Sequence, residues 1–177
     1  MNKSDIVITG YARTPMGSFH GSLSTEKATS LGSIAIKGAL DKANISKNDV
    51  DDIIMGCVLP AGLGQAPARQ SAIGAGIPNT AGATTINKMC GSGMRAAMIA
   101  NDQLLAGSSN ISIAGGIESM SNAPYVVPKV RAGLRMGHGE LKDHMFLDGL
   151  EDAYEPGRLM GSYAETTAEV YQFTREA

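Results

Sequence analysis

The sequence predicts an α/β fold with a mostly parallel sheet and flanking or central helices. Short apolar runs of strand type alternate along the chain with stretches of helical periodicity, and the connections between them are short. The segment Ile53–Ile117 also carries only four charged residues, which is typical of strands that helices cover on both faces. Strand–helix alternation of this kind forms βαβ crossovers, and these pair strands in parallel.

The first half of the pattern contains two strands and one helix. Asp5–Tyr11 is an apolar run that leads into the turn-forming segment Arg13–Gly17, so it predicts a strand. Lys27–Asn44 has small and apolar residues at helical spacing and predicts an amphipathic helix. Asp52–Leu59 is a second apolar run, and Pro60 ends the strand that it predicts.

The second half of the pattern continues the alternation. Pro67 suits the first turn of a short helix that runs to about Gly76. We then expect a strand at Thr84–Met89, a helix at Gly91–Ala106 and a fourth strand at Asn110–Gly116. A mostly parallel sheet of four strands is therefore the expected core.

Composition changes after about Ser121. Residues 122–156 hold scattered Pro, Gly, Met and charged residues without a sustained period, which indicates an excursion rather than more sheet. A final helix is expected from Gly161, where Ser162 and Glu165 form an S-x-x-E capping box. We therefore predict an N-terminal α/β domain at residues 1–120 and a second region at residues 121–177.

Charge and composition exclude several classes of protein. The chain has 15 Lys+Arg against 17 Asp+Glu, so it lacks the basic excess that nucleic acid as a partner requires. The longest charge-free run, Gln70–Asn87, contains Pro78 and many polar residues and cannot span a membrane. Two cysteines are too few for a disulfide framework, and Asp5 interrupts any signal-peptide apolar region. A cytoplasmic location is the expectation.

Cys90 is the candidate nucleophile. It falls where a predicted strand meets a predicted helix, and the positive end of a helix dipole stabilises a thiolate. Gly91 and Gly93 remove side chains, so that a substrate can approach the sulfur and backbone N–H groups can face an oxyanion. Cys57 alternates with apolar residues along its strand, and we expect it only to pack.

The same segment also fits a dinucleotide site. Gly91–Ala96 matches G-x-G-x-x-G/A after a strand, and Glu118 ends the next strand, where a ribose-binding acid is wanted. Glu118 lies 27 residues after Gly91 rather than about 20, and the fingerprint normally occupies the first βα turn. The pattern alone supports the dinucleotide site and the cysteine nucleophile nearly equally.

Four motifs resemble the thiolase family, which comprises acetyl-CoA acetyltransferases and 3-ketoacyl-CoA thiolases. The segment around Cys90 resembles the nucleophile motif of that family. Arg13–Gly17 resembles its R-T-P-x-G turn, Gly64–Gln70 its G-Q-x-P-A-R-Q helix start, and Gly115–Pro124 its G-G-x-E-S-M-S-N-x-P stretch. Four motifs in the family order favour the nucleophile. The resemblance implies a thiolase-like βαβαβαβ half at residues 1–120 and the beginning of a loop domain at residues 121–177.

The resemblance also implies a mechanism. Cys90 would attack an acyl-CoA thioester and hold the acyl group, while its backbone N–H contributes to an oxyanion hole. Met160 would line the acyl and pantetheine pocket, and Leu159 stands where many biosynthetic members have His. The expected activity is acetyl-CoA C-acetyltransferase, and a 3-ketoacyl-CoA thiolase of fatty acid β-oxidation is the alternative. Coenzyme A is a substrate, and no cofactor is expected.

Thiolases draw a base histidine and a second cysteine from their C-terminal half. None of His20, His138 and His144 lies in a context that resembles the family's G-H-P motif, and their spacing matches no metal site. We therefore expect an incomplete fragment of a thiolase that is inactive alone and forms a homotetramer when full length. The alternatives from other classes are an NAD-binding oxidoreductase domain and a non-catalytic association fragment.

Overall fold

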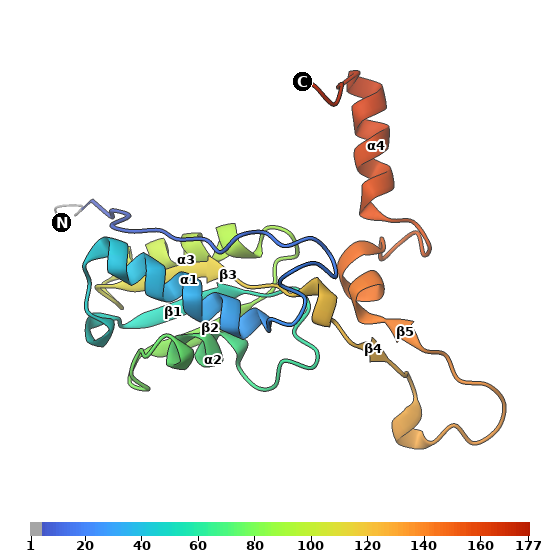
Figure 1. The fold of residues 1–177 in the computed structure, drawn as a ribbon, viewed down its shortest axis with the longest axis horizontal. Helices are drawn as coiled ribbons and strands as arrows, with labels where there is room; N and C mark the ends of the chain where they lie inside the picture. The colour runs from blue at the N-terminus through green and yellow to red at the C-terminus, as the bar shows by residue number, and fades with distance from the viewer. Residues whose placement is uncertain (1–4) are drawn as a thin grey trace. The chain divides into compact units, whose positions relative to one another are not determined.

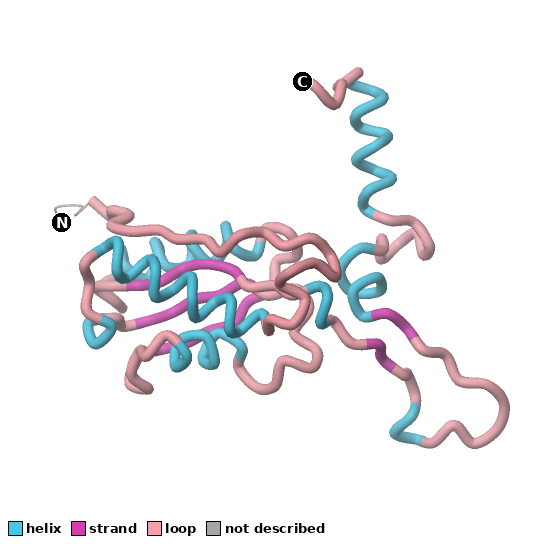
Figure 2. Tube along the Cα trace, in the orientation of Figure 1, coloured by secondary structure: helices cyan, strands magenta, loops and turns pink. Residues whose placement is uncertain are grey.

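A computed structural model describes residues 5–177, which belong to two compact units that meet between Ala123 and Pro124. The first unit contains a three-stranded parallel sheet of order β2-β1-β3 with helices around it (Figures 1 and 2). Its strands are β1 (Asp52–Gly56), β2 (Gly82–Ile86) and β3 (Ser112–Gly116). Its α-helices are α1 (Ala28–Ala43), α2 (Pro67–Gly74) and α3 (Ser92–Ala106). The predicted α/β class and parallel pairing are confirmed.

The central strand β1 is buried on both faces. Ile53 and Met55 belong to the main core, together with residues of α1 and α2. Ile54 points the other way and packs with Ala96 and Ala100 of α3. This alternation follows from the two-residue period of a strand, and it places α3 on the face of the sheet opposite α1 and α2.

The predicted strand at Asp5–Tyr11 is wrong, because within the described residues this segment pairs with no strand. Val7 and Ile8 are 69% and 89% exposed. Further along, Gly10 lies so close to α1 that an added Cβ would come within 2.5 Å of the Ala39 carbonyl oxygen. The segment therefore follows a helix rather than a sheet edge, and an apolar pattern cannot supply the pairing partner that a strand requires.

Two carboxylates shorten the predicted strands. Glu118 accepts hydrogen bonds from the N–H groups of Val58 and Leu59, at 2.8 and 3.0 Å, so β1 ends earlier than predicted. Asp51 accepts from the N–H groups of Asn110 and Ile111, at 2.7 and 3.1 Å, so β3 begins two residues late. These two backbone donors lower the pKa of Asp51. The ends of the sheet are thus fixed by side chains.

The second unit contains a small antiparallel pair and one α-helix. The pair is β4 (Tyr125–Val126) with β5 (Lys142–Asp143), and the helix is α4 (Met160–Tyr171). A π-helix covers Phe146–Leu150, and 3₁₀ turns occur at Val130–Ala132 here and at Lys47–Asp49 and Met120–Asn122 in the first unit. These elements carry few buried apolar residues.

The predicted capping box of the last helix is wrong. The helix begins one residue earlier than expected, with Leu159 as its N-cap. The Ser162 hydroxyl donates to the Leu159 carbonyl oxygen at 2.7 Å, so it lies inside the first turn rather than before it. A serine in this position bonds back to a carbonyl instead of accepting from an N–H.

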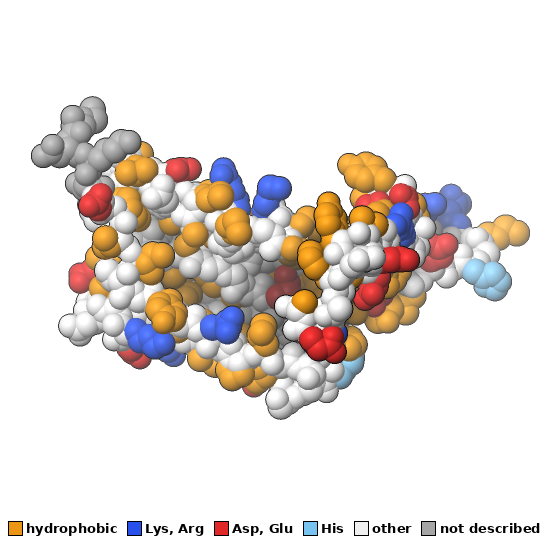
Figure 3. Space-filling view, turned by 90° about the horizontal axis from the view of Figure 1, so that it is seen from above, with side chains coloured by type: hydrophobic (Ala, Val, Ile, Leu, Met, Phe, Trp, Pro, Cys, Tyr) orange, Lys and Arg blue, Asp and Glu red, His pale blue; other side chains and the backbone are white. Residues whose placement is uncertain are grey.

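The outer face of α3 is apolar and exposed. Met94, Met98 and Leu105 are 69%, 49% and 56% exposed. Apolar side chains are also visible across the surface of the first unit in the space-filling view (Figure 3). The expected burial of the charge-poor segment on both faces therefore holds at β1. In α3, by contrast, only the side that packs against the sheet is buried.

Contact between α3 and β1 requires a glycine at position 56. A Cβ added at Gly56 would lie 2.5 Å from Ser92 Cβ and 2.7 Å from the Ser92 carbonyl carbon. We expect Gly56→Ala to lower the free energy of unfolding by about 1–3 kcal/mol, because α3 has to move away from the strand. Urea denaturation measures the change.

Gly93→Ala is the matched control, because a Cβ there meets nothing closer than the Gly115 carbonyl oxygen at 3.9 Å. Alanine also favours a helix over glycine by up to about 1 kcal/mol, so this variant should be neutral or more stable. Equal destabilisation by the two substitutions would contradict the assigned contact.

Candidate active site

Cys90 lies in a tight turn between β2 and α3. Met89 has φ of +50°, a left-handed conformation that few side chains adopt. The Met89 N–H donates to Asn87 Oδ1 at 2.9 Å, and the Asn87 amide donates to the Val58 carbonyl at 3.3 Å. The strained residue immediately before Cys90 is therefore tied to the loop that follows β1.

The buried Ser92 holds the turn from inside. Its hydroxyl donates to the Met89 carbonyl oxygen at 2.6 Å and accepts from the Lys88 N–H at 2.8 Å. The N–H of Gly91 donates to the Lys88 carbonyl oxygen at 3.1 Å. Ser92 is also the residue that meets Gly56 of β1, so the turn is anchored to the centre of the sheet.

The Cys90 thiol is exposed at this turn. Gly91 is the N-cap of α3 and has no capping side chain. The Ser92 N–H donates to the Met89 carbonyl oxygen at 2.9 Å, whereas the N–H groups of Gly93 and Met94 have no hydrogen-bond partner among the described residues. Within residues 5–177, the backbone N–H of Cys90 forms no hydrogen bond. The arrangement can therefore present a sulfur nucleophile and an N–H donor to the same thioester carbonyl.

Gly91 has room for a side chain. A Cβ at this position would meet the Lys88 carbonyl oxygen at 3.4 Å, which is an ordinary contact, and φ is −90°. Packing inside the described chain therefore does not demand a glycine here. The predicted role of Gly91, an open approach for a substrate to the Cys90 sulfur, stays a prediction.

The other residues of the G-x-G-x-x-A pattern are used for packing. Ala96 is fully buried against Ile54, and Gly93 faces the carbonyl group of Gly115. Glu118 is committed to the N–H groups after β1, so its carboxylate is not free to bind a ribose. The geometry argues against the dinucleotide interpretation.

Cys57 differs from Cys90 in burial and in charge. It is 2% exposed, and its thiol donates to Glu118 Oε1 at 3.6 Å. Burial, followed by the negative charge of Glu118, raises the pKa of Cys57 to about 12. The sequence indicated a packing role, but it did not reveal the Glu118 contact. The sequence signal that could have indicated this contact is Glu118 itself, an acidic residue directly after an apolar strand.

Met160 is placed in the second unit, where it begins α4 and is 41% exposed. His144 is buried there, and its Nδ1 lies 2.5 Å from Asp148 Oδ2. Of the three histidines, only His20 lies in the first unit with Cys90, and no hydrogen bond joins the two among the described residues. Across residues 5–177, no three His, Cys, Asp or Glu side chains gather as metal ligands, and no helix has the length and apolar character for a membrane crossing.

A model of the thiolase N-terminal domain matches residues 6–177. The chain belongs to the thiolase family. It is 52% identical to acetyl-CoA acetyltransferase 2 of Arabidopsis thaliana over 99% of its length and 43% of that relative. It is 47% identical to a cytosolic acetyl-CoA acetyltransferase of Gibberella zeae, over 99% of the chain and 44% of that relative.

A mitochondrial acetyl-CoA acetyltransferase of Danio rerio is 49% identical over 98% of this chain and 40% of its own length. The chain thus spans less than half the length of these relatives. They carry both cytosolic and mitochondrial names, so their names do not assign this chain to one compartment.

The two cysteines should differ strongly in reactivity. At pH 8 a thiol with a pKa of about 12 is only about one part in 10⁴ ionised, and burial blocks access as well. We expect iodoacetamide to label Cys90 of the native protein and to leave Cys57 unlabelled until denaturant is added. Peptide mapping by mass spectrometry measures both sites.

The matched variants are Cys57→Ala, which should keep native labelling, and Cys90→Ala, which should abolish it. If Cys57 of the native protein were labelled at a rate comparable to that of Cys90, the conclusion that Cys57 is inert and Cys90 accessible would be contradicted.

Proposed function

We propose that the protein is an acetyl-CoA C-acetyltransferase, which transfers acyl groups between CoA thioesters through a covalent intermediate on Cys90. The observation that carries the proposal is the exposed thiol of Cys90, held in a fixed turn at the start of α3. Membership of the thiolase family and the printed names of the relatives support the substrate class. Coenzyme A is then a substrate, and no cofactor is required.

In the first half-reaction the Cys90 sulfur attacks the carbonyl carbon of acetyl-CoA. The charge on the carbonyl oxygen develops against the unpaired N–H of Cys90. A carbon–sulfur bond to Cys90 forms, the bond to CoA breaks, and CoA leaves as its thiol after taking up a proton. The missing side chain of Gly91 would leave the approach to the sulfur open.

In the second half-reaction a base removes a proton from the α-carbon of a second acetyl-CoA. The carbanion attacks the acetyl group on Cys90, which gives acetoacetyl-CoA and frees the thiol. The reverse direction is thiolysis by free CoA. We assign the base to residues outside this chain, because none of its three histidines lies in a context that resembles the G-H-P motif of thiolases. Met160 would line the acyl pocket, and residues 121–177 would begin the loop domain.

A 3-ketoacyl-CoA thiolase of fatty acid β-oxidation is the second candidate. The observation that favours it is Leu159, which stands where many biosynthetic thiolases carry His. Rates with acetoacetyl-CoA and with longer 3-ketoacyl-CoA substrates separate the two activities. A cytoplasmic location is part of the first proposal, and the two-cysteine composition of the chain supports it.

The chain alone should not turn over acetoacetyl-CoA, whereas the complete protein that carries it should. Loss of acid–base catalysis costs about 10²–10⁴-fold, and lost oxyanion donors cost about another 10²–10³-fold. Thiolysis of acetoacetyl-CoA, followed by the absorbance of the substrate, measures the rate. In the complete protein Cys90→Ala should abolish turnover, and Cys57→Ala should retain most of it.

Strong turnover by the 177-residue chain, abolished by Cys90→Ala, would contradict the assignment of the base to residues outside it. A complete protein that is inactive, or that stays active after Cys90→Ala, would overturn the proposed function and favour a non-catalytic association role.

We further propose that the complete protein is a homotetramer in which the loop between β4 and β5 contacts another subunit. Figure 2 shows the course of this loop. It exposes apolar residues throughout: Val127, Val130, Leu134, Met136 and Leu141 are 37%, 55%, 50%, 97% and 67% exposed. Exposed apolar residues gathered on one loop are typical of an interaction surface.

Deletion of residues 127–141 should reduce tetramers to dimers in sedimentation experiments, because the resemblance to thiolases implies a separate dimer contact around residues 65–87. Met136→Asp, at a position that is 97% exposed, should weaken the tetramer without affecting folding. Lys142→Ala is the control outside the loop. A tetramer that survives both loop changes would refute this role.

A further inference from the structure

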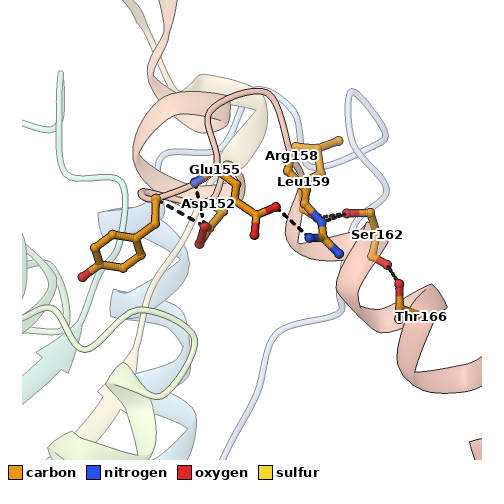
Figure 4. A network of polar contacts seen from close by, with 7 residues as sticks. Asp152, Glu155, Arg158, Leu159, Ser162 and Thr166 are labelled. Atoms are coloured by element: carbon orange, nitrogen blue, oxygen red, sulfur yellow. Dashed lines mark hydrogen bonds and ion pairs between the residues drawn. The ribbon is translucent and has the colours of Figure 1, made fainter. Parts of the chain in front are cut away.

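The segment that precedes α4 is a closed turn, and its side chains form the network of polar contacts in Figure 4. Glu151 and Leu159 form an antiparallel bridge, and the Asp152 N–H donates to the Arg158 carbonyl oxygen at 2.8 Å. The Gly157 N–H donates to a Glu151 carboxylate oxygen at 2.5 Å. The chain therefore enters α4 from a fixed loop rather than from a free linker.

The Arg158 guanidinium is held from three sides. Its Nη1 donates to Glu155 Oε2 at 2.7 Å, its Nε donates to Ser162 Oγ at 3.4 Å, and its carbon lies 3.7 Å from the centre of the Tyr163 ring. Glu155 is itself fixed, because its N–H donates to Asp152 Oδ2 at 3.0 Å. A lysine ammonium cannot reproduce this combination of a planar fork and ring stacking.

Ser162 links Arg158 to the backbone of Leu159, the residue before Met160. Its hydroxyl accepts from Arg158 and donates to the Leu159 carbonyl oxygen at 2.7 Å, and its N–H donates to the same oxygen at 2.9 Å. The backbone at Leu159 is thus fixed from both sides. Met160 is the next residue and the first of α4.

We propose that Arg158 is a positioning residue, which fixes the Leu159–Met160 backbone so that Met160 is presented to the acyl group in one arrangement. This inference rests on the proposed function, which places Met160 in the acyl pocket. The network is largely exposed, and exposed ion pairs contribute little to stability. The loss of Arg158 therefore changes substrate binding more than folding.

A double-mutant cycle in the complete protein tests this coupling. Arg158→Ala, Arg158→Lys and Glu155→Gln should each raise KM for the acyl-CoA about 5- to 10-fold and change kcat less than 2-fold, which corresponds to a coupling of the size found between contacting residues. Met160→Ala should raise KM similarly. Arg158→Ala combined with Met160→Ala should be no worse than Met160→Ala alone.

Two further measurements exclude other roles for Arg158. The fold-change should be equal with a pantetheine thioester that lacks the nucleotide, because Arg158 acts through Met160 and not on a phosphate. Lys142→Ala, which removes a similar exposed ion pair with Glu140, is the control and should leave KM unchanged. The iodoacetamide labelling rate of Cys90 should stay constant in all variants.

Additive effects of Arg158→Ala and Met160→Ala, full rescue by Arg158→Lys, or an effect confined to CoA thioesters would each overturn the inference and leave the proposed function intact. A complete protein that keeps its activity after Cys90→Ala would overturn the proposed function itself, and the inference with it.

Discussion

The contact between Gly56 of β1 and Ser92 of α3 is the constraint on which the candidate site depends. A side chain at position 56 cannot be accommodated, and the start of α3 can therefore lie directly on the central strand. Ser92 uses its hydroxyl in the same place to bond Lys88 and Met89. The turn that exposes Cys90 is thus fixed by the sheet beneath it, and the chemistry of the sulfur depends on that packing.

Glu118 separates the two cysteines chemically. Its carboxylate ends β1 by accepting the N–H groups of Val58 and Leu59, and its charge beside the buried Cys57 raises the pKa of that thiol to about 12. The same residue that fixes the loop after β1 therefore also keeps one thiol protonated. Within residues 5–177, no carboxylate forms a hydrogen bond with the Cys90 thiol on the exposed turn.

Much of the fold could be predicted from local pattern, since α1, α2, α3 and the parallel strand pairs follow from periodicity and from Pro67. The failures have a common cause. Asp5–Tyr11 has a strand-like pattern but no pairing partner among the described residues, and side chains distant in sequence, Asp51 and Glu118, set the strand ends. The exposed Cys90 turn followed from its motif, whereas the contacts of Arg158 depend on a closed loop that no short pattern specifies.

The central claim is that Cys90 carries the acyl group, and trapping the covalent intermediate tests it most directly. The complete protein is mixed with acetyl-CoA, quenched in acid and analysed by intact mass and peptide mapping. The account predicts one acetyl group on Cys90, none on Cys57, and loss of the label when free CoA is added before the quench. An acetyl group on another residue, or an unmodified Cys90 in a protein that turns over acetoacetyl-CoA, would contradict it.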